Sequence, residues 1–187
     1  MPDKKRLTTM RKITNSELGR KSVEEFAAAD KLPVTVVLDN VRSAGNVGSF
    51  FRTCDAFGIG HIALCGICAT PPSKEIHKTA LGAEQTVAWS HYPTTTEAIE
   101  ALHAAGYTVL AIEQVEGAEM LHTAHFADRT PLALVFGNEV EGVAQEAVDM
   151  CDGAIEIPQV GTKHSLNVAV SGGAVLWEVF RTLSREI

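Results

Sequence analysis

Residues 34–53 read VTVVLDNVRSAGNVGSFFRT. The β-branched run at 34–38 is typical of a buried strand, and the Gly/Asn turn at 43–48 leads into a helix that reaches Phe57. Gly58 is expected to end this helix, because glycine readily adopts the left-handed conformation common after helix C-termini. This stretch therefore predicts the first strand and helix of an α/β fold.

Strand-like and helical runs alternate from there to the C-terminus. Further strands are predicted at 61–65, 86–90, 107–112, 132–136 and 154–157. Further helices are predicted at 73–78, 94–105, 143–150 and 166–183. Residues 113–131 look irregular, with one turn near Met120. This alternation indicates a mostly parallel sheet with helices on both faces, and such sheets bind ligands in loops beyond the C-terminal ends of the strands.

Length and composition are those of an ordinary globular protein. The chain has 187 residues, of which 45% are hydrophobic and 21% charged, so one compact domain with its own core is expected. No apolar run approaches the roughly 18 residues of a membrane span, and the N-terminus lacks the apolar stretch of a signal peptide. The four cysteines are too scattered for a disulfide framework. We expect a cytoplasmic protein that does not associate with membranes.

The charge is unevenly distributed. The net charge is −7, yet eight of the 16 basic residues lie in residues 1–31. A net negative charge argues mildly against nucleic acid as a partner, whereas a basic N-terminus favours an anionic partner held there. A solvated tail explains the same pattern. Ser22 and Glu25 form a capping-box pattern for a short helix. We therefore divide the chain into a basic arm, 1–32, and a main domain, 33–187.

Several common site motifs are missing from the sequence. It contains no P-loop, no H-E-x-x-H and no G-x-S-x-G elbow. The G-x-G at 58–60 follows a helix and precedes a strand, which is the wrong order for a dinucleotide fingerprint. Cys65 and Cys68 have no second ligand pair at zinc spacing, so packed, reduced thiols are expected and no metal is required.

Three loops carry polar residues that folding alone does not need. In the first, Asn46 is placed to cap the following helix, and Arg52 stands in an otherwise apolar helical stretch. Because six residues separate the two, they converge only if Asn46 lies in the turn rather than in the helix. A helix cap plus a surface arginine is the alternative.

The second and third loops follow the strands at 132–136 and 154–157. The second reads GNEVEG and places Glu139 between two glycines, although an ordinary strand-to-helix connection would look similar. The third runs from Ile157 to Asn167 at the start of the last helix, where capping by Ser165 is the simpler explanation. The last helix carries an apolar stripe and the pair Gly172-Gly173, which suggests tight packing against a neighbouring helix or subunit.

Taken together, these three loops resemble those of the SpoU/TrmH family of the SPOUT superfamily, which are S-adenosylmethionine-dependent RNA ribose 2′-O-methyltransferases. The resemblance covers about residues 33–184. Its first motif, N-x-x-x-x-x-R-T, ends in Arg52-Thr53, and its second, G-N-E-x-x-G, occupies 137–142. The third motif comprises Ile157-Pro158 and the run SLNV at 165–168.

The resemblance implies an α/β sheet with a deep trefoil knot in its C-terminal part, and a homodimer with first-motif residues at the interface, close to the partner's cofactor site. The methyl donor, S-adenosylmethionine, would be held near a set of five residues. These are Ile112, Gly137, Ile157, Ser165 and Leu166. S-adenosylhomocysteine would be the product.

The resemblance also implies catalytic roles. Arg52 would hold a substrate phosphate and stabilise the ribose alkoxide, because the guanidinium group of arginine does not give up its proton readily and is a poor base. The residues expected to position it, the ribose and the methyl donor are Asn46, Glu139, Ser165 and Asn167. The chain is most similar to enzymes that methylate guanosine 18 in the tRNA D-loop. Ribosomal RNA, another tRNA position and a silent RNA-binding module remain alternatives.

Overall fold

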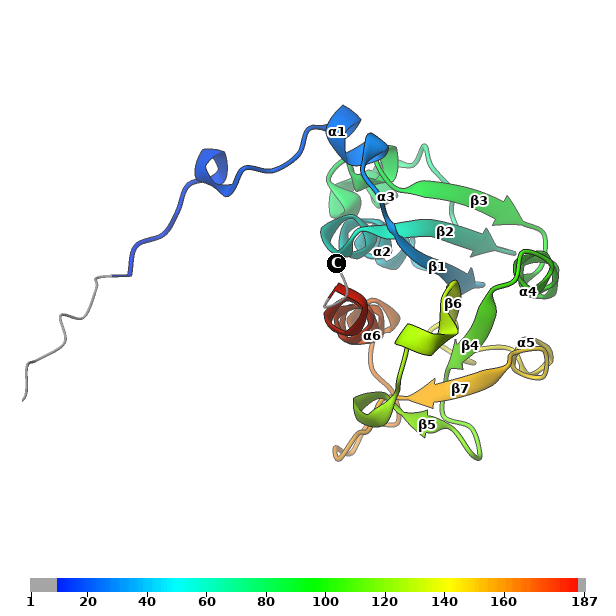
Figure 1. Cartoon of the computed structure of the whole chain (residues 1–187). Helices are drawn as coiled ribbons and strands as arrows, with labels where there is room; N and C mark the ends of the chain where they lie inside the picture. The colour runs from blue at the N-terminus through cyan, green and yellow to red at the C-terminus, as the bar shows by residue number, and fades with distance from the viewer. Residues whose placement is uncertain (1–9, 185–187) are drawn as a thin grey trace, which may run out of the picture.

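A computed structural model of the chain describes residues 10–184 (Figure 1). Its centre is a sheet of seven strands, and every pairing within it is parallel. The order across the sheet is β3-β2-β1-β6-β4-β7-β5. The strands are β1 (Leu32–Asp39), β2 (Ile59–Cys65), β3 (Ala88–Tyr92), β4 (Thr108–Ile112), β5 (Glu119–Met120), β6 (Leu132–Phe136) and β7 (Gly153–Glu156). The predicted α/β class and parallel sheet are confirmed.

Helices cover both faces of the sheet, as Figure 1 shows. One face carries α2 (Ala44–Phe57), α3 (Lys74–Ala80) and α6 (Val168–Leu183), and the other carries α4 (Thr95–Ala104) and α5 (Gln145–Val148). Each layer has its own core. Phe50 and Leu176 lie in the core on the α2 side, whereas Val37 and Ile99 lie in the core on the α4 side. This arrangement explains why the strands read as nearly continuous apolar runs.

Helix α2 has a capping residue at each end, but Asn46 is not one of them. Ser43 is the N-cap, and its side chain accepts a hydrogen bond from the backbone N–H of Asn46 at 3.2 Å. Gly58, with φ of 64°, ends the helix as predicted. Asn46 therefore lies in the first helical turn, and its expected role as the cap is wrong.

Several predicted segments differ in extent from the structure. The strand predicted at 86–90 is β3 at 88–92, and the helix predicted at 166–183 begins at Val168. The irregular stretch 113–131 contains the short strand β5 and the 3-10 helices η3 (Leu121–Thr123) and η4 (Ala127–Arg129). The helix predicted at 143–150 shortens to α5, whose N-cap is Ala144 with an extended ψ of 139°. A further 3-10 helix, η2 (Ala83–Gln85), precedes β3.

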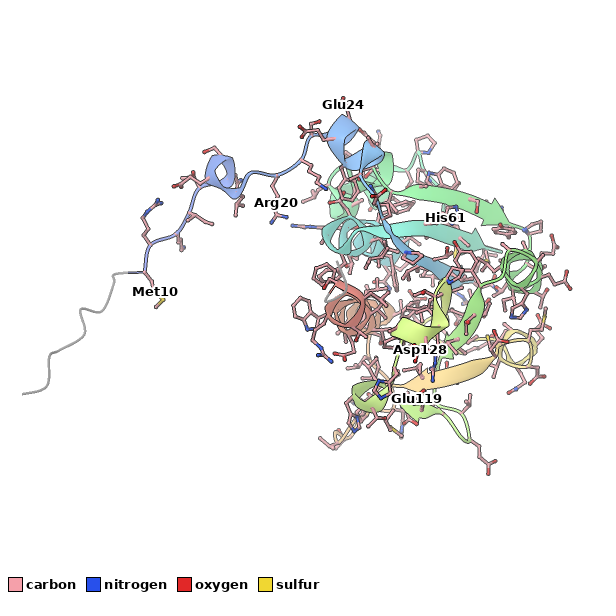
Figure 2. All side chains as sticks on the ribbon, in the orientation of Figure 1. Met10, Arg20, Glu24, His61, Glu119 and Asp128 are labelled. Carbon is pink, nitrogen blue, oxygen red and sulfur yellow. The ribbon has the colours of Figure 1, made fainter. Side chains whose placement is uncertain are left out.

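The N-terminal arm leads away from the sheet (Figure 2). Its described part holds η1 (Asn15–Leu18) and α1 (Val23–Ala28), and the side chains of residues 10–25 are exposed. The predicted capping box is confirmed, because Ser22 accepts from the N–H of Glu25 and the Glu25 carboxylate accepts from the N–H of Ser22. The basic residues at positions 4–6 lie outside the described range. No helix within 10–184 is long and apolar enough to cross a membrane.

Candidate active site

A cleft of about 480 Å³ opens at the C-terminal edge of the sheet. Loops that follow β4, β6 and β7 form its walls, as expected for a parallel sheet. Its volume lies in the roughly 300–1,000 Å³ range of small-molecule sites. The five residues expected to hold a cofactor all line this cleft. They are Ile112, Gly137, Ile157, Ser165 and Leu166.

The lining of the cleft combines apolar and acidic groups. Phe136 and Ile155 supply apolar surface beside the residues just named, while Glu113, Glu139 and Glu141 supply carboxylates. Among the described residues, no lysine or arginine lines the cleft. The cleft therefore suits a ligand with a flat apolar part and a positive charge.

Asn46, Glu139 and Asn167, which come from three distant parts of the sequence, form one chain of hydrogen bonds. The side-chain oxygen of Asn167 accepts from the backbone N–H groups of Ala169 and Val170, and so caps α6. Its Nδ2 donates to Oδ1 of Asn46 at 3.3 Å, and Asn46 Nδ2 donates to Oε1 of Glu139 at 2.6 Å. Helix α6 is thereby linked to α2 and to the loop after β6.

The carboxyl group of Glu139 is held in its charged form. Partial burial acts to raise its pKa, but hydrogen bonds from the Asn46 side chain and from the backbone N–H groups of Glu139, Arg42 and Ser43 outweigh that effect. The pKa of Glu139 therefore lies below its ordinary value. At neutral pH this carboxylate can only accept hydrogen bonds.

Arg52 does not join these residues within one chain. Its exposed side chain lies on α2, six residues or about 9 Å along the helix from Asn46, and on a different face. In the described part of the chain it has no hydrogen bond or ion pair, and it does not line the cleft. The side chains of Asn46 and Arg52 were expected to converge only if Asn46 lay in the turn before the helix. Asn46 lies inside the helix, so the two do not converge.

The structure revises what was expected of two loop residues, Ser165 and Gly137. Ser165 does not cap the last helix, because the helix begins at Val168 and Asn167 is its cap. Gly137 lines the cleft, but the fold itself requires glycine at this position, because a Cβ there would lie 1.9 Å from the carbonyl carbon of Gly142. The glycine thus permits a tight crossing of two backbone segments.

The cysteines are packed, as expected. Cys65 and Cys68 are buried, and burial raises the pKa of these thiols to about 12 and about 11 respectively. The Cys68 sulfur also accepts from the N–H of Val41 at 3.1 Å, which fixes the first loop. In the described residues, no group of three or more candidate ligands could hold a metal ion.

Sequence reasoning missed two carboxylates. Asp39 is buried at the end of β1, and Glu113 lies in the cleft just after β4. Both accept hydrogen bonds from the backbone that follows the GNEVEG loop. A carboxylate that directly follows a continuous apolar strand is the signal that could have drawn attention to both.

Comparison with known proteins agrees with this geometry. The model of the SpoU rRNA methylase family matches residues 33–177. The chain belongs to this family. It is 32% identical over 166 residues to a tRNA (guanosine(18)-2′-O)-methyltransferase of Thermus thermophilus, which covers 89% of this chain and 84% of that protein. The family resemblance drawn from the three loops is therefore confirmed.

Solved structures of SpoU enzymes share the fold. The A. aeolicus TrmH/SpoU tRNA modifying enzyme matches with a TM-score of 0.78 and 25% identity, over 88% of this chain and 82% of that one. An AdoMet-bound rRNA methyltransferase from Sinorhizobium meliloti matches with a TM-score of 0.76 and 31% identity, over 84% of this chain but only 60% of that one.

Proposed function

We propose that this SpoU-family chain is a cytoplasmic enzyme that transfers the methyl group of S-adenosylmethionine to a ribose 2′-hydroxyl of RNA, with guanosine in the tRNA D-loop as the favoured target. The observation that carries the proposal is the hydrogen-bonded set of Asn46, Glu139 and Asn167 beside the cleft. It unites one residue from each family motif. The AdoMet-bound relative and the tRNA-specific relative support the choice of cofactor and substrate.

The cleft fits S-adenosylmethionine in shape and in charge. Ile112, Ile157 and Leu166 offer an apolar slot for an adenine ring, and the carboxylates of Glu113 and Glu141 favour a cationic ligand. When bound, the cofactor supplies an electrophilic methyl group, and S-adenosylhomocysteine is the product.

The residues beside the cleft would orient the ribose. The Glu139 carboxylate can accept a hydrogen bond from a ribose hydroxyl, while Asn46 holds that carboxylate in place. Ser165, exposed at the rim, can donate or accept with the same substrate. A 2′-hydroxyl is a poor nucleophile until its developing negative charge is stabilised, and we assign that role to Arg52, which would also hold a phosphate. Alignment of the reacting atoms would supply much of the rate.

Arg52 lies outside the cleft of its own chain, and this supports a homodimer in which each arginine acts at the partner's cleft. Helix α6 carries an exposed apolar stripe that includes Val170 and Trp177, which are 58% and 51% exposed. Gly173 lies on the same side and has open space around it, whereas Gly172 packs against Phe50. Exposed apolar stripes of this kind commonly pack against a second subunit. We propose that this surface joins two copies.

We further propose that the main domain, 33–187, contains the trefoil knot of its family. Support comes from three segments that line one cleft: 113–114, 137–142 and 157–168. Gln114 donates from Nε2 to the carbonyl oxygen of His164 at 3.2 Å, which ties two of them together. The residues of the expected arm, 1–32, would form a separate basic segment, apart from Leu32, which is the first residue of β1.

The charges that remain unpaired support RNA as the partner. Residues 32–187 carry eight basic and 18 acidic side chains. Arg42, whose backbone N–H bonds the cleft residue Glu139, and Lys163, which precedes the cleft residue His164, are both exposed. Neither forms an ion pair in the described part of the chain, unlike Arg129, which bonds Glu119 at 2.7 Å. Arg42 and Lys163, with the basic arm, would contact RNA phosphates on either side of the target nucleotide.

Incubation with labelled S-adenosylmethionine and either bulk tRNA or bulk rRNA tests the proposal. We expect label in tRNA. Label in rRNA alone would retain the chemistry and change the substrate. Cofactor binding without transfer to either RNA would instead favour a silent RNA-binding module.

A further inference from the structure

The loop that carries Glu139 is anchored at its C-terminal end by two carboxylates. Asp39, the last residue of β1, accepts a hydrogen bond from the backbone N–H of Ala144 at 2.8 Å. Glu113, just after β4, accepts from the N–H of Val143 at 2.9 Å. Because β1 and β4 flank β6, from which the loop emerges, the two carboxylates hold consecutive N–H groups from opposite sides.

Asp39 is buried without a cation. Only 1% of its surface is exposed, and in the described residues it forms no ion pair with lysine or arginine. Its Oδ1 accepts from Thr95 Oγ1 at 2.5 Å and from Asn40 Nδ2 at 2.8 Å, while its Oδ2 accepts from Ala144. A buried carboxylate is tolerated only when hydrogen bonds replace its hydration. Here the donors come from three separate segments.

The loop itself is shaped to receive Glu113. Gly142 has a φ of 72°, and a Cβ at this position would lie 2.2 Å from Glu113 Oε2. Asn138 and Gly142 exchange two backbone hydrogen bonds of 3.0 and 3.1 Å, which close the loop below Glu139. The loop therefore has little freedom once Val143 and Ala144 are held.

We propose that Asp39 and Glu113 are positioning residues that fix the 138–142 loop and so direct the Glu139 carboxylate toward Asn46. The proposal rests on the methyltransferase function given above and deepens it. Asp39 does not line the cleft, so its effect on catalysis passes through the loop. Thr95 belongs to the same buried network but does not touch the loop, and this makes it a matched control.

The test compares Asp39→Asn with Thr95→Val. Asparagine cannot satisfy all three donors, because one of its two polar atoms is itself a donor. Valine removes the Thr95 hydrogen bond to Asp39 Oδ1 and leaves the bonds from Asn40 and Ala144. Both variants should lose stability to denaturant. Only Asp39→Asn should slow single-turnover methyl transfer to tRNA, by about tenfold or more, since small displacements of positioned groups cost that much. The dissociation constant for S-adenosylmethionine, measured by calorimetry, should stay within about threefold in both.

Amide hydrogen exchange gives a readout that does not need activity. Exchange at residues 138–144 should accelerate in Asp39→Asn and in the less buried Glu113→Gln, and should stay as in wild type in Thr95→Val. Unchanged exchange in both carboxylate variants, or equal transfer rates in Asp39→Asn and Thr95→Val, would overturn the positioning role. If the wild type transfers no methyl group, the proposed function fails, and the exchange data still decide the role of the two carboxylates.

Discussion

Asn167 donates a hydrogen bond from Nδ2 to Oδ1 of Asn46, although 121 residues separate them. The orientation of both amides follows from their neighbours. The Glu139 carboxylate cannot donate, so Asn46 must turn its NH2 group toward it and its oxygen toward Asn167. Asn167 must in turn present its oxygen to the N–H groups that begin α6. The three side chains thus have one consistent arrangement.

Substitutions can separate the two roles of Asn167, which caps α6 and donates a hydrogen bond to Asn46. Asn167→Asp keeps a good N-cap but cannot donate to Asn46, so we expect its unfolding free energy to stay within about 0.5 kcal/mol of wild type. Methyl transfer should fall by about tenfold or more. Asn167→Ala should lose the cap as well, at about 1 kcal/mol. Urea denaturation and single-turnover transfer provide the two measurements. Full activity in Asn167→Asp would mean that the residue serves only as a cap.

The lowered pKa of Glu139 predicts a pH dependence of stability. A carboxyl group whose pKa is lower in the folded than in the unfolded state stabilises the fold above the unfolded value, and this contribution is lost as the pH falls through the folded value. The Glu139 contribution should therefore be complete above about pH 5 and decline below it. Denaturant unfolding between pH 3 and pH 6 should show a shallower acid loss in Glu139→Gln than in wild type. Parallel curves would show that the hydrogen bonds to Glu139 do not favour its charged form.

Arg52→Ala should abolish methyl transfer and leave cofactor affinity within a few-fold, because Arg52 does not line the cleft of its own chain. If it acts across a dimer, an equal mixture of Arg52→Ala and Glu139→Gln subunits should recover about a quarter of wild-type activity. Half the dimers are then mixed, and each mixed dimer has one complete site. Activity that stays at zero after subunit exchange would place both residues at one chain's site.

RNA binding should depend on salt through Arg42 and Lys163. Replacing either by glutamine should lower the slope of log affinity against log salt concentration by about one. Arg129→Gln, which removes the same charge from a residue already paired with Glu119, should leave the slope nearly unchanged. Filter binding of tRNA between low and moderate salt gives these slopes. Equal slopes in all three variants would exclude the two cations from the RNA contact.

The adjacent glycines of α6 should respond in opposite ways. A Cβ on Gly172 would lie 2.3 Å from the Phe50 ring, so Gly172→Ala should destabilise the chain by about 1–3 kcal/mol. Gly173 has nothing within 4 Å, so alanine there should add helix propensity worth about 0.5–1 kcal/mol. Thermal unfolding compares the two. If Gly173→Ala instead weakens dimerisation in light scattering, the partner subunit approaches α6 closely at this position.

Much of the fold follows from local sequence pattern. The run at 132–136 and the Gly58 signal lie where the structure has a strand and a helix end, because apolar periodicity and capping chemistry act over a few residues. Strand β5 was missed because two residues, Glu119 and Met120, carry no readable period. The order of strands in the sheet also lay beyond local pattern, since it depends on contacts between distant segments.

The site was predicted less completely than the fold. The motifs singled out Asn46, Glu139 and Asn167, which the structure joins by hydrogen bonds, but Asn46 and Ser165 were each assigned a capping role that belongs to another residue. The cap is set by where a helix starts, and a shift of two or three residues in that start moves the capping role to another residue. Asp39 was missed because its partner Ala144 lies 105 residues away, and no spacing within the sequence reveals such a contact.

The most direct test of the central claim is the chemistry of the modified nucleoside. The protein would be incubated with S-adenosylmethionine and unmodified tRNA, and the RNA digested to nucleosides for mass spectrometry, with Glu139→Gln as the control. We predict 2′-O-methylguanosine in the wild-type reaction and little or none in the control. A methyl group found on a base instead of a ribose, or equal yields from wild type and Glu139→Gln, would contradict the account.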